Sequence, residues 1–192
     1  PTFARTLPTK VWWDWSTAGK DGPVAKDQYG LPLYDKQKGD FKWAKDIKPA
    51  YLWFNGGVDR YLAGDKMDPS KVTHLNYPRG DRNDKAALIT PFKLMQGKQP
   101  YDSGNNVFAV PNLWGGYWGH WDWNKAIADG MKAAGLEYSG QYGFAPTDMY
   151  WKVNHMVVPK AQALKCNDCH STNGRLDWKA LGYAGDPRAA KR

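Results

Sequence analysis

Apolar residues along this chain occur in short runs, and glycine, proline or asparagine interrupts nearly all of them. Two runs, residues 50–54 and 58–62, flank Asn55-Gly56-Gly57, a sequence typical of a tight hairpin turn. A second hairpin is predicted from residues 87–95 and 106–110, which a polar Gly/Pro segment joins. Residues 1–112 therefore predict a turn-rich region of extended chain and short β-hairpins that wraps the core.

Helical spacing begins after Pro111. Within residues 125–134, Ile127 and Met131 lie four apart, Asn124 is a suitable N-cap and Gly135 a suitable C′ residue. A last helix is predicted to start at Pro159 and to run into the cysteines near the C-terminal end, because proline is favoured at the first helical position. We expect residues 113–192 to form a helical region in one structural unit with 1–112. The expected fold class is mainly α, with extensive irregular coil and a few short β-hairpins.

Aromatic rings supply much of the apolar surface. The chain has 11 Trp, 11 Tyr and 6 Phe, together with 20 Gly and 13 Pro. It is too aromatic for a disordered chain, and no segment approaches the roughly 20 apolar residues of a membrane span. The Trp-rich segments are interpreted as packing around the core or a cofactor, in preference to a sugar-stacking platform.

The net charge and the first residues bear on which partners and which kind of chain are expected. The net charge is +8, but Asp residues lie between the lysines, so a solvated surface is favoured over a nucleic-acid site. Positive charge also suits a bound anionic cofactor. The sequence begins at Pro1, without an initiator Met or the pattern of a signal peptide, so we expect a mature processed chain or a piece of a longer one.

The sharpest motif is Cys166-Asn167-Asp168-Cys169-His170, a C-x-x-C-H sequence. On a helix, residues three apart share a face, so both thiols can add to the two vinyl groups of one haem. His170 follows directly and can place its imidazole beneath the iron as the proximal ligand. This pattern predicts covalent attachment of a c-type haem.

Two cysteines three apart can also belong to a zinc site, a thioredoxin-like redox motif or a disulfide. A zinc site needs about four ligands, and only His155, His120 and His74 remain to complete one; a zinc-stabilised, Trp-rich binding module is the alternative function. A thioredoxin-like motif needs a preceding strand, whereas a helical run is predicted here. A disulfide between residues three apart on a helix braces almost nothing.

A haem needs a second axial ligand, and His155 is the first candidate. A helix over residues 159–170 is roughly 16 Å long, which places His155 and His170 at opposite ends of it. We therefore expect His155 to be the distal ligand of a neighbouring haem. His120, in a Gly/Trp segment, is the second candidate, and His74 is interpreted as structural. No other catalytic motif is present, and no catalytic residue is assigned.

The strings that surround the haem motif resemble one family. They are residues 138–144, 149–151, 154–157, 159–160 and 163–171, with 8–19, 55–65, 91–93 and 97–100 farther upstream. Together they are similar to the C-terminal end of the octahaem tetrathionate reductase family of multihaem c-type cytochromes.

This resemblance implies an exported protein, periplasmic or extracellular, with closely packed haems, which reduces tetrathionate or small nitrogen oxyanions. It implies Cys166 and Cys169 as tethers, His170 as proximal ligand and His155 as a distal ligand. Family members carry eight haems and this chain has one attachment motif. We therefore expect another haem-bearing polypeptide, either a preceding portion or a partner chain, and a redox partner protein. The family's catalytic haem, with its lysine ligand, is expected outside this chain.

Overall fold

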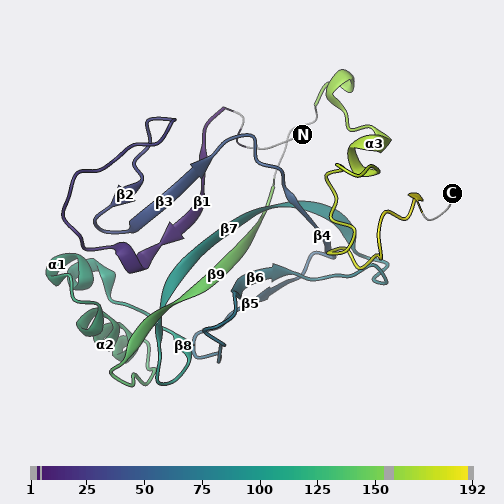
Figure 1. The fold of residues 1–192 in the computed structure, drawn as a ribbon. Coiled ribbons are helices and arrows are strands. Elements are labelled where there is room, and N and C mark those ends of the chain that lie inside the picture. Colours follow the sequence, from purple (N-terminus) through teal and green to yellow (C-terminus); the bar gives the residue numbers. More distant parts are fainter. Residues whose placement is uncertain (1–3, 5, 154–157, 190–192) are drawn as a thin grey trace.

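The computed structural model describes residues 4, 6–153 and 158–189. In this part of the chain, nine strands form one mixed sheet, with the order β2-β3-β1-β7-β9-β6-β5 and with β4 and β8 also paired to β7 (Figure 1). The strands are β1 (Thr9–Asp14), β2 (Tyr34–Asp35), β3 (Gly39–Ala44), β4 (Ala50–Phe54), β5 (Val58–Arg60), β6 (Thr73–Pro78), β7 (Leu88–Asp102), β8 (Val107–Phe108) and β9 (Tyr142–Lys152). The helical elements are η1 (Trp15–Thr17), η2 (Leu113–Tyr117), α1 (Trp118–His120), α2 (Trp123–Ala133), η3 (Lys160–Gln162) and α3 (Cys166–Cys169).

The expected fold class, mainly α, is wrong. The longest element is the strand β7, which pairs antiparallel with β9 from Phe92↔Lys152 to Asp102↔Tyr142. Both contain residues that normally argue against a central strand, namely Pro91, Gly97 and Pro100 in β7 and Pro146 in β9. Their aromatic and β-branched neighbours, in contact with other strands on both sides, outweigh those local breaks.

The first predicted hairpin is wrong in its pairing. Residues 50–54 and part of 58–62 are strands, but β4 pairs with β7 and β5 pairs with β6. In the second hairpin the predicted strands do pair, as β7 with β8, but at Tyr101↔Phe108 and Asp102↔Val107 and not through residues 87–95. The apolar runs were recognisable, whereas the partner of β4 lies far away in the sequence.

The helix predicted at residues 125–134 is confirmed as α2. Its N-cap is Asp122, whose carboxylate accepts a hydrogen bond from the Lys125 backbone at 3.1 Å, and Gly135 follows the helix with φ +69°. The apolar face of α2 is buried in a core cluster of Ala18, Val107, Tyr117, Trp123, Ala126, Ile127 and Met131. Gly130 lets the helix approach the chain at Val110, because a Cβ there would lie 1.9 Å from the Val110 carbonyl oxygen.

The helix predicted from Pro159 into the cysteines is wrong over most of its length. Only η3 and the single turn α3 are helical, and between them Ala163 has the extended angles φ −63° and ψ 143°. Alanine-rich composition is a weak determinant where a short segment has little apolar surface to bury. The 16 Å helix that separated His155 from His170 is therefore absent.

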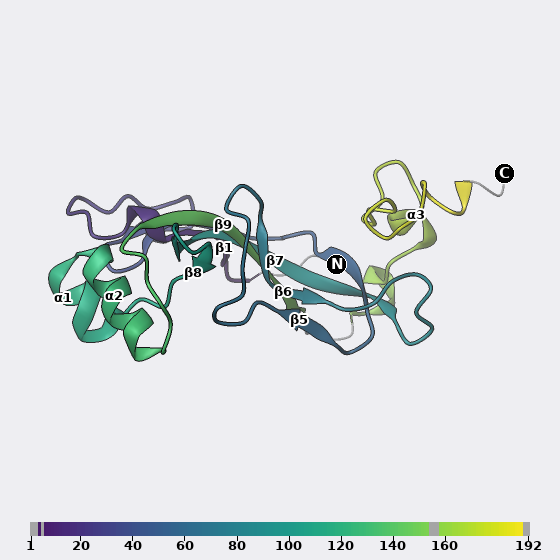
Figure 2. The same ribbon diagram turned by 90° about the horizontal axis from the view of Figure 1, so that it is seen from below.

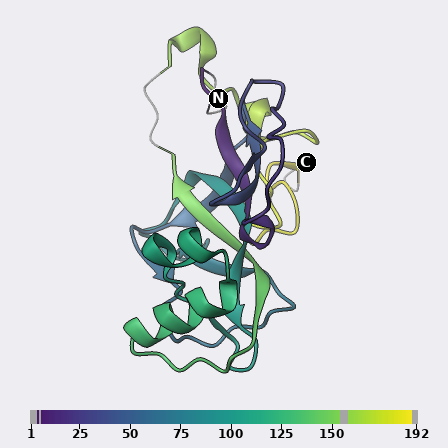
Figure 3. The same ribbon diagram turned by 90° about the vertical axis from the view of Figure 1, so that its left-hand side faces the viewer.

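The elements are spread along the two long strands. Helices α1 and α2 lie at one end of β7 and β9, and the C-terminal segment with α3 lies near the other end (Figures 1, 2 and 3). The β7–β9 ladder joins residues on either side of position 112. Within the described residues, no helix is long and apolar enough to cross a membrane.

Asp102 is a fully buried carboxylate at the end of β7. It accepts hydrogen bonds from the Gly104 backbone at 3.0 Å, the Asn105 side chain at 2.8 Å and the Ser139 backbone at 2.9 Å, and also from the Ser139 hydroxyl. Burial raises the pKa of Asp102, but these hydrogen bonds outweigh it and leave the pKa below its ordinary value. Ionised Asp102 therefore closes the turn after β7 and anchors the start of β9.

We predict that Asp102→Asn lowers the free energy of unfolding by about 2–4 kcal/mol, because a neutral amide cannot accept all of these hydrogen bonds. The folded-state pKa lies below the unfolded value of about 3.9. The difference between wild type and variant is therefore fully present at neutral pH, and it shrinks as the pH falls through the depressed pKa. Urea unfolding at several pH values measures it.

Asp68→Asn is the matched control, because Asp68 is exposed and its bonds are local, to Ser70 and Lys71. Its effect on the free energy of unfolding should be much smaller than that of Asp102→Asn. Equal losses for the two variants would contradict the role assigned to Asp102.

Candidate haem-attachment site

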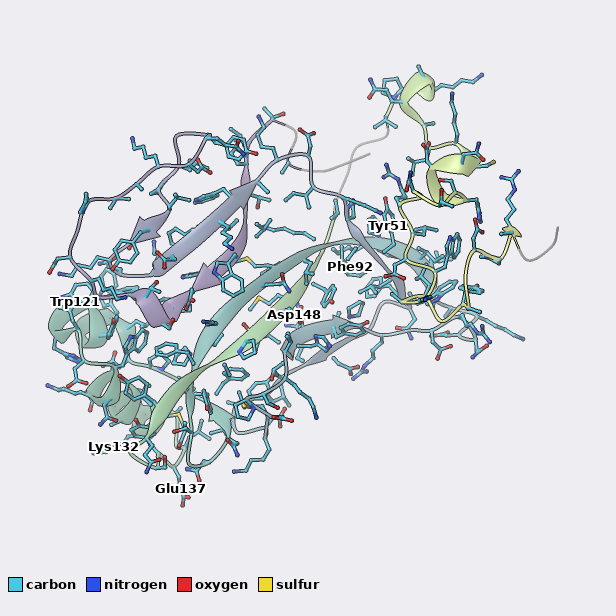
Figure 4. All side chains as sticks on the ribbon, viewed as in Figure 1. Tyr51, Phe92, Trp121, Lys132, Glu137 and Asp148 are labelled. Atoms are coloured by element: carbon cyan, nitrogen blue, oxygen red, sulfur yellow. The ribbon has the colours of Figure 1, made fainter. Side chains whose placement is uncertain are left out.

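The C-terminal segment that carries the cysteines is attached to β4 and the residues just before it. The Arg175 Nη1 donates to the Tyr51 hydroxyl at 2.9 Å, and the Lys48 Nζ donates to the Gly174 carbonyl oxygen at 3.1 Å. Figure 4 shows Tyr51 on the sheet directly beside this segment. These contacts bring together residues more than 120 positions apart in the sequence.

Two further side chains hold the end of the segment. The Trp53 indole N–H donates to the Leu181 carbonyl oxygen at 3.0 Å, and the Arg82 Nη1 donates to that of Gly182 at 2.8 Å. Leu181 itself is 1% exposed. The segment is thus fixed by side chains from β4 and from the loops around the sheet, most of which bond to its backbone, with the buried Leu181 as apolar anchor.

The cysteines are the first and last residues of α3. Asp168 accepts a hydrogen bond from the Lys165 backbone at 2.7 Å, which closes the turn, and the His170 backbone donates to the Cys166 carbonyl oxygen at 2.8 Å. Cys166 and Cys169 lie three apart in this turn, so both thiols lie on one side of it. Both are free thiols; Cys166 is exposed and Cys169 half-buried.

Gly174 allows the chain to fold back against the cysteine turn. A Cβ at this position would lie 2.4 Å from the Cys169 carbonyl oxygen, so any larger residue would push the loop away. The Arg175 backbone then donates to the Asp168 carbonyl oxygen at 2.8 Å. The segment that follows His170 is therefore held close to its ring.

His170 is fixed by a carboxylate and an aromatic ring. Its Nδ1 lies 2.8 Å from the Asp186 Oδ1, and its ring stacks on Trp178 with centroids 5.0 Å apart and planes inclined by 23°. The hydrogen bond with His170 is the main cause that lowers the pKa of Asp186. An ionised Asp186 places the imidazole proton on Nδ1 and leaves the Nε2 lone pair available as a ligand.

A cavity of about 740 Å³ adjoins this histidine. Its lining includes His170, Trp178, Asp186 and Arg188, with Asn167 from α3. Ligand sites in proteins commonly measure about 300–1,000 Å³. Two free thiols on one turn, an oriented imidazole and a cavity beside them fit a covalently attached haem.

The other sequence-predicted ligands are not part of this cluster. His155 lies outside the described residues. His120, at the end of α1, accepts a hydrogen bond at Nδ1 from the Asp122 backbone at 3.1 Å, and its Nε2 is buried without a hydrogen-bond partner in the part of the chain that the structure describes. Among the described residues, no three His, Cys, Asp or Glu side chains are grouped to hold a metal ion, so the zinc alternative finds no support there.

Sequence analysis missed Asp186 and Trp178. Asp186 follows His170 by 16 residues and lies between Gly185 and Pro187, where an aspartate normally indicates only a turn. Trp178 had no periodic pattern around it. Only the folded loop brings both side chains to the histidine.

Comparison with known proteins gives two matches. The family described as "Cytochrome c bacterial" matches residues 10–173. The crystal structure of octahaem cytochrome c from Shewanella oneidensis is 54% identical, with a TM-score of 0.94 over 100% of this chain and 46% of that chain. This chain thus spans less than half the length of that protein. No protein of the curated collection matches.

These matches confirm the resemblance to octahaem c-type cytochromes that the sequence predicted. They also support covalently bound haem c as the cofactor.

We predict that Asp186→Asn raises the midpoint potential of the haem bound at this site. The carboxylate makes the imidazole a stronger donor and so stabilises the ferric state, which a neutral amide does less well. A tenfold change in the relative affinity for the two oxidation states corresponds to ~59 mV for one electron. Spectroelectrochemical titration measures this shift.

Asp177→Asn is the control from the same loop. Asp177 is exposed, and its carboxylate accepts hydrogen bonds from the nearby Lys179 and Ala180 backbones, at 3.1 and 3.0 Å. It should leave the potential unchanged, and equal shifts for both variants would assign the effect to net charge alone.

Proposed function

The chain belongs to the bacterial cytochrome c family, and from this we propose that it is an electron-transfer segment of a multihaem c-type cytochrome with one covalently attached haem. The observation that carries the proposal is the arrangement at α3. Cys166 and Cys169 share one side of a single turn, and the adjacent His170 is oriented by Asp186 with its Nε2 available.

Each side chain has a separate task in this proposal. Cys166 and Cys169 tether the haem through thioether bonds, and His170 is the proximal ligand. Trp178 restricts the rotation of the His170 ring, and Asp186 holds the proton on its Nδ1. When bound, the haem supplies a one-electron carrier. A second histidine on the iron leaves no open position, which suits electron transfer and not substrate binding.

The distal ligand in this proposal is His155, on a neighbouring haem. The resemblance to the octahaem family supports His155, which lies shortly before the C-x-x-C-H motif in the sequence. His120 is the second candidate because its Nε2 is buried. The chain between η3 and α3 is extended at Ala163 and at Lys165, so η3 does not continue as a helix into the cysteine turn.

The other haems of the assembly are proposed to lie on another haem-bearing polypeptide. This chain has one C-x-x-C-H motif and corresponds to 46% of an octahaem relative. The full assembly is then a reductase of tetrathionate or small nitrogen oxyanions, whose catalytic haem lies outside this chain and which receives electrons from a redox partner protein. Thioether attachment takes place outside the cytoplasm in bacteria, so we place the protein in the periplasm or outside the cell.

The first test is covalent haem on this chain. We expect a c-type pyridine haemochrome spectrum and an intact mass increased by one haem. Cys166→Ser combined with Cys169→Ser should remove both, because neither thioether can form. A matched Ser171→Ala variant should retain both. A colourless chain at its bare mass, with zinc found by elemental analysis, would favour the binding module instead.

The second test concerns the haem that His155 serves. We expect His155→Ala to leave the low-spin spectrum of the haem on this chain unaltered and to convert one neighbouring haem to high spin. Electron paramagnetic resonance spectra of the assembled cytochrome distinguish a low-spin haem from a high-spin haem. Conversion of the haem at His170 would show that both histidines share one iron.

A further inference from the structure

His74 forms a second histidine–carboxylate pair, on the sheet. Its Nδ1 lies 2.5 Å from the Asp148 Oδ1, which links β6 to β9. The Asp148 side chain is 7% exposed, whereas that of His74 is 48% exposed. A buried carboxylate thus holds one nitrogen of a half-exposed imidazole.

A β-bulge in β6 sets the direction of this ring. His74 pairs with Asp148 and Asn76 with Met149, so Leu75 is the additional residue in β6. The Asn76 side-chain oxygen accepts a hydrogen bond from the Tyr150 backbone at 2.6 Å, which fixes the bulge. Bulges often re-aim a side chain next to a functional site.

Two tyrosines hold the His74 ring on this face of the sheet. Its centroid lies 4.7 Å from that of Tyr77 and 6.0 Å from that of Tyr150, and the two tyrosine rings are 5.0 Å apart. The ring is therefore held by a tilted and an edge-on aromatic contact as well as by the Asp148 hydrogen bond. Rotation of the ring would break these contacts.

His170, the predicted proximal ligand, shares two of these features. It also has its Nδ1 on a carboxylate and its ring on an aromatic side chain. Metal-ligating histidines almost always have the second ring nitrogen bonded in this way, because it fixes the tautomer. Within the described residues, no hydrogen bond involves the Nε2 of His74. From the sequence alone His74 was interpreted as structural, whereas these contacts are those of a ligand.

The surroundings favour a haem iron over a free metal ion. In the part of the chain described, no three His, Cys, Asp or Glu side chains could hold an ion together. A porphyrin supplies four nitrogens, so its iron needs only one from this face. In Figure 4, Asp148 lies on the long strands, away from Tyr51 and the C-terminal segment beside it. The haem concerned is therefore one carried by another polypeptide.

We infer that His74 is an axial ligand, through Nε2, of a haem iron carried by the other haem-bearing polypeptide of the assembly, with Asp148 as its positioning residue. The inference rests on the proposed function. It extends the proposed function by an interface, because this face of β6 and β9 would then contact the neighbouring haem directly.

The experiment uses the complete haem-loaded cytochrome. We expect His74→Ala to convert one haem from low spin to high spin in electron paramagnetic resonance, and added imidazole to restore it. His74→Met should keep that iron six-coordinate and raise its midpoint potential, because a thioether ligand stabilises the ferrous state. Asp148→Asn should keep low spin and raise the same potential.

Tyr77→Phe is the control, since it retains the ring contact with His74 and should change neither spin state nor potential. If His74→Ala does not fold, His74→Met decides. Unchanged low-spin content and potential in a folded His74 variant would overturn the inference. The pyridine haemochrome of this chain, separated under denaturing conditions, reports the proposed function independently: absence of covalent haem there defeats that proposal, whatever the His74 variants show.

Discussion

Strand β7 carries three strands in succession along one edge and β9 along the other. β4 pairs with its residues 88–92, β1 with 96–98 and β8 with 101–102, while β9 covers 92–102. The close approach of β1 depends on Gly97, because a Cβ there would lie 2.4 Å from the Trp13 carbonyl oxygen. The chain continues from β8 into the helices, and side chains of β4 contact the C-terminal segment that carries the cysteines. Because both strands pair with β7, β7 fixes the two ends of the molecule relative to each other.

The C-terminal segment that carries the cysteines is held by the sheet indirectly. Within the described residues it adds no strand to the sheet; side chains such as Trp53 and Arg82 reach out and donate to its carbonyl oxygens. Each such bond is worth about 1 kcal/mol, so the segment is held by several modest contacts and one buried leucine. Thioether bonds then have a structural as well as a chemical consequence, because they cross-link this lightly held segment to a rigid group.

The sequence was sufficient where chemistry is local. The C-x-x-C-H motif, helix α2 and its Gly135 terminus all follow from neighbouring residues, and so did the family resemblance. The fold class was not predictable in the same way. β7 and β9 contain proline and glycine, and their strand character comes from long-range partners. Pairings such as Lys48 with Gly174 or His170 with Asp186 carry no local pattern, because only the closed sheet and the folded loop create them.

The two histidine–carboxylate pairs solve one positional problem by different means. Asp186 lies 16 residues after His170 on the segment that follows the cysteine turn, and in the proposed function the thioether tethers on that turn would fix the haem relative to the ring. His74 has no such tether nearby. A group that binds its Nε2 must be met at a position fixed in advance, and the rigid β6–β9 ladder, with Asp148 buried in it, supplies that fixation. The exposures of the two side chains fit this division: Asp148 is 7% exposed and holds the ring from within the sheet, whereas His74 is 48% exposed and can be approached by a neighbouring group.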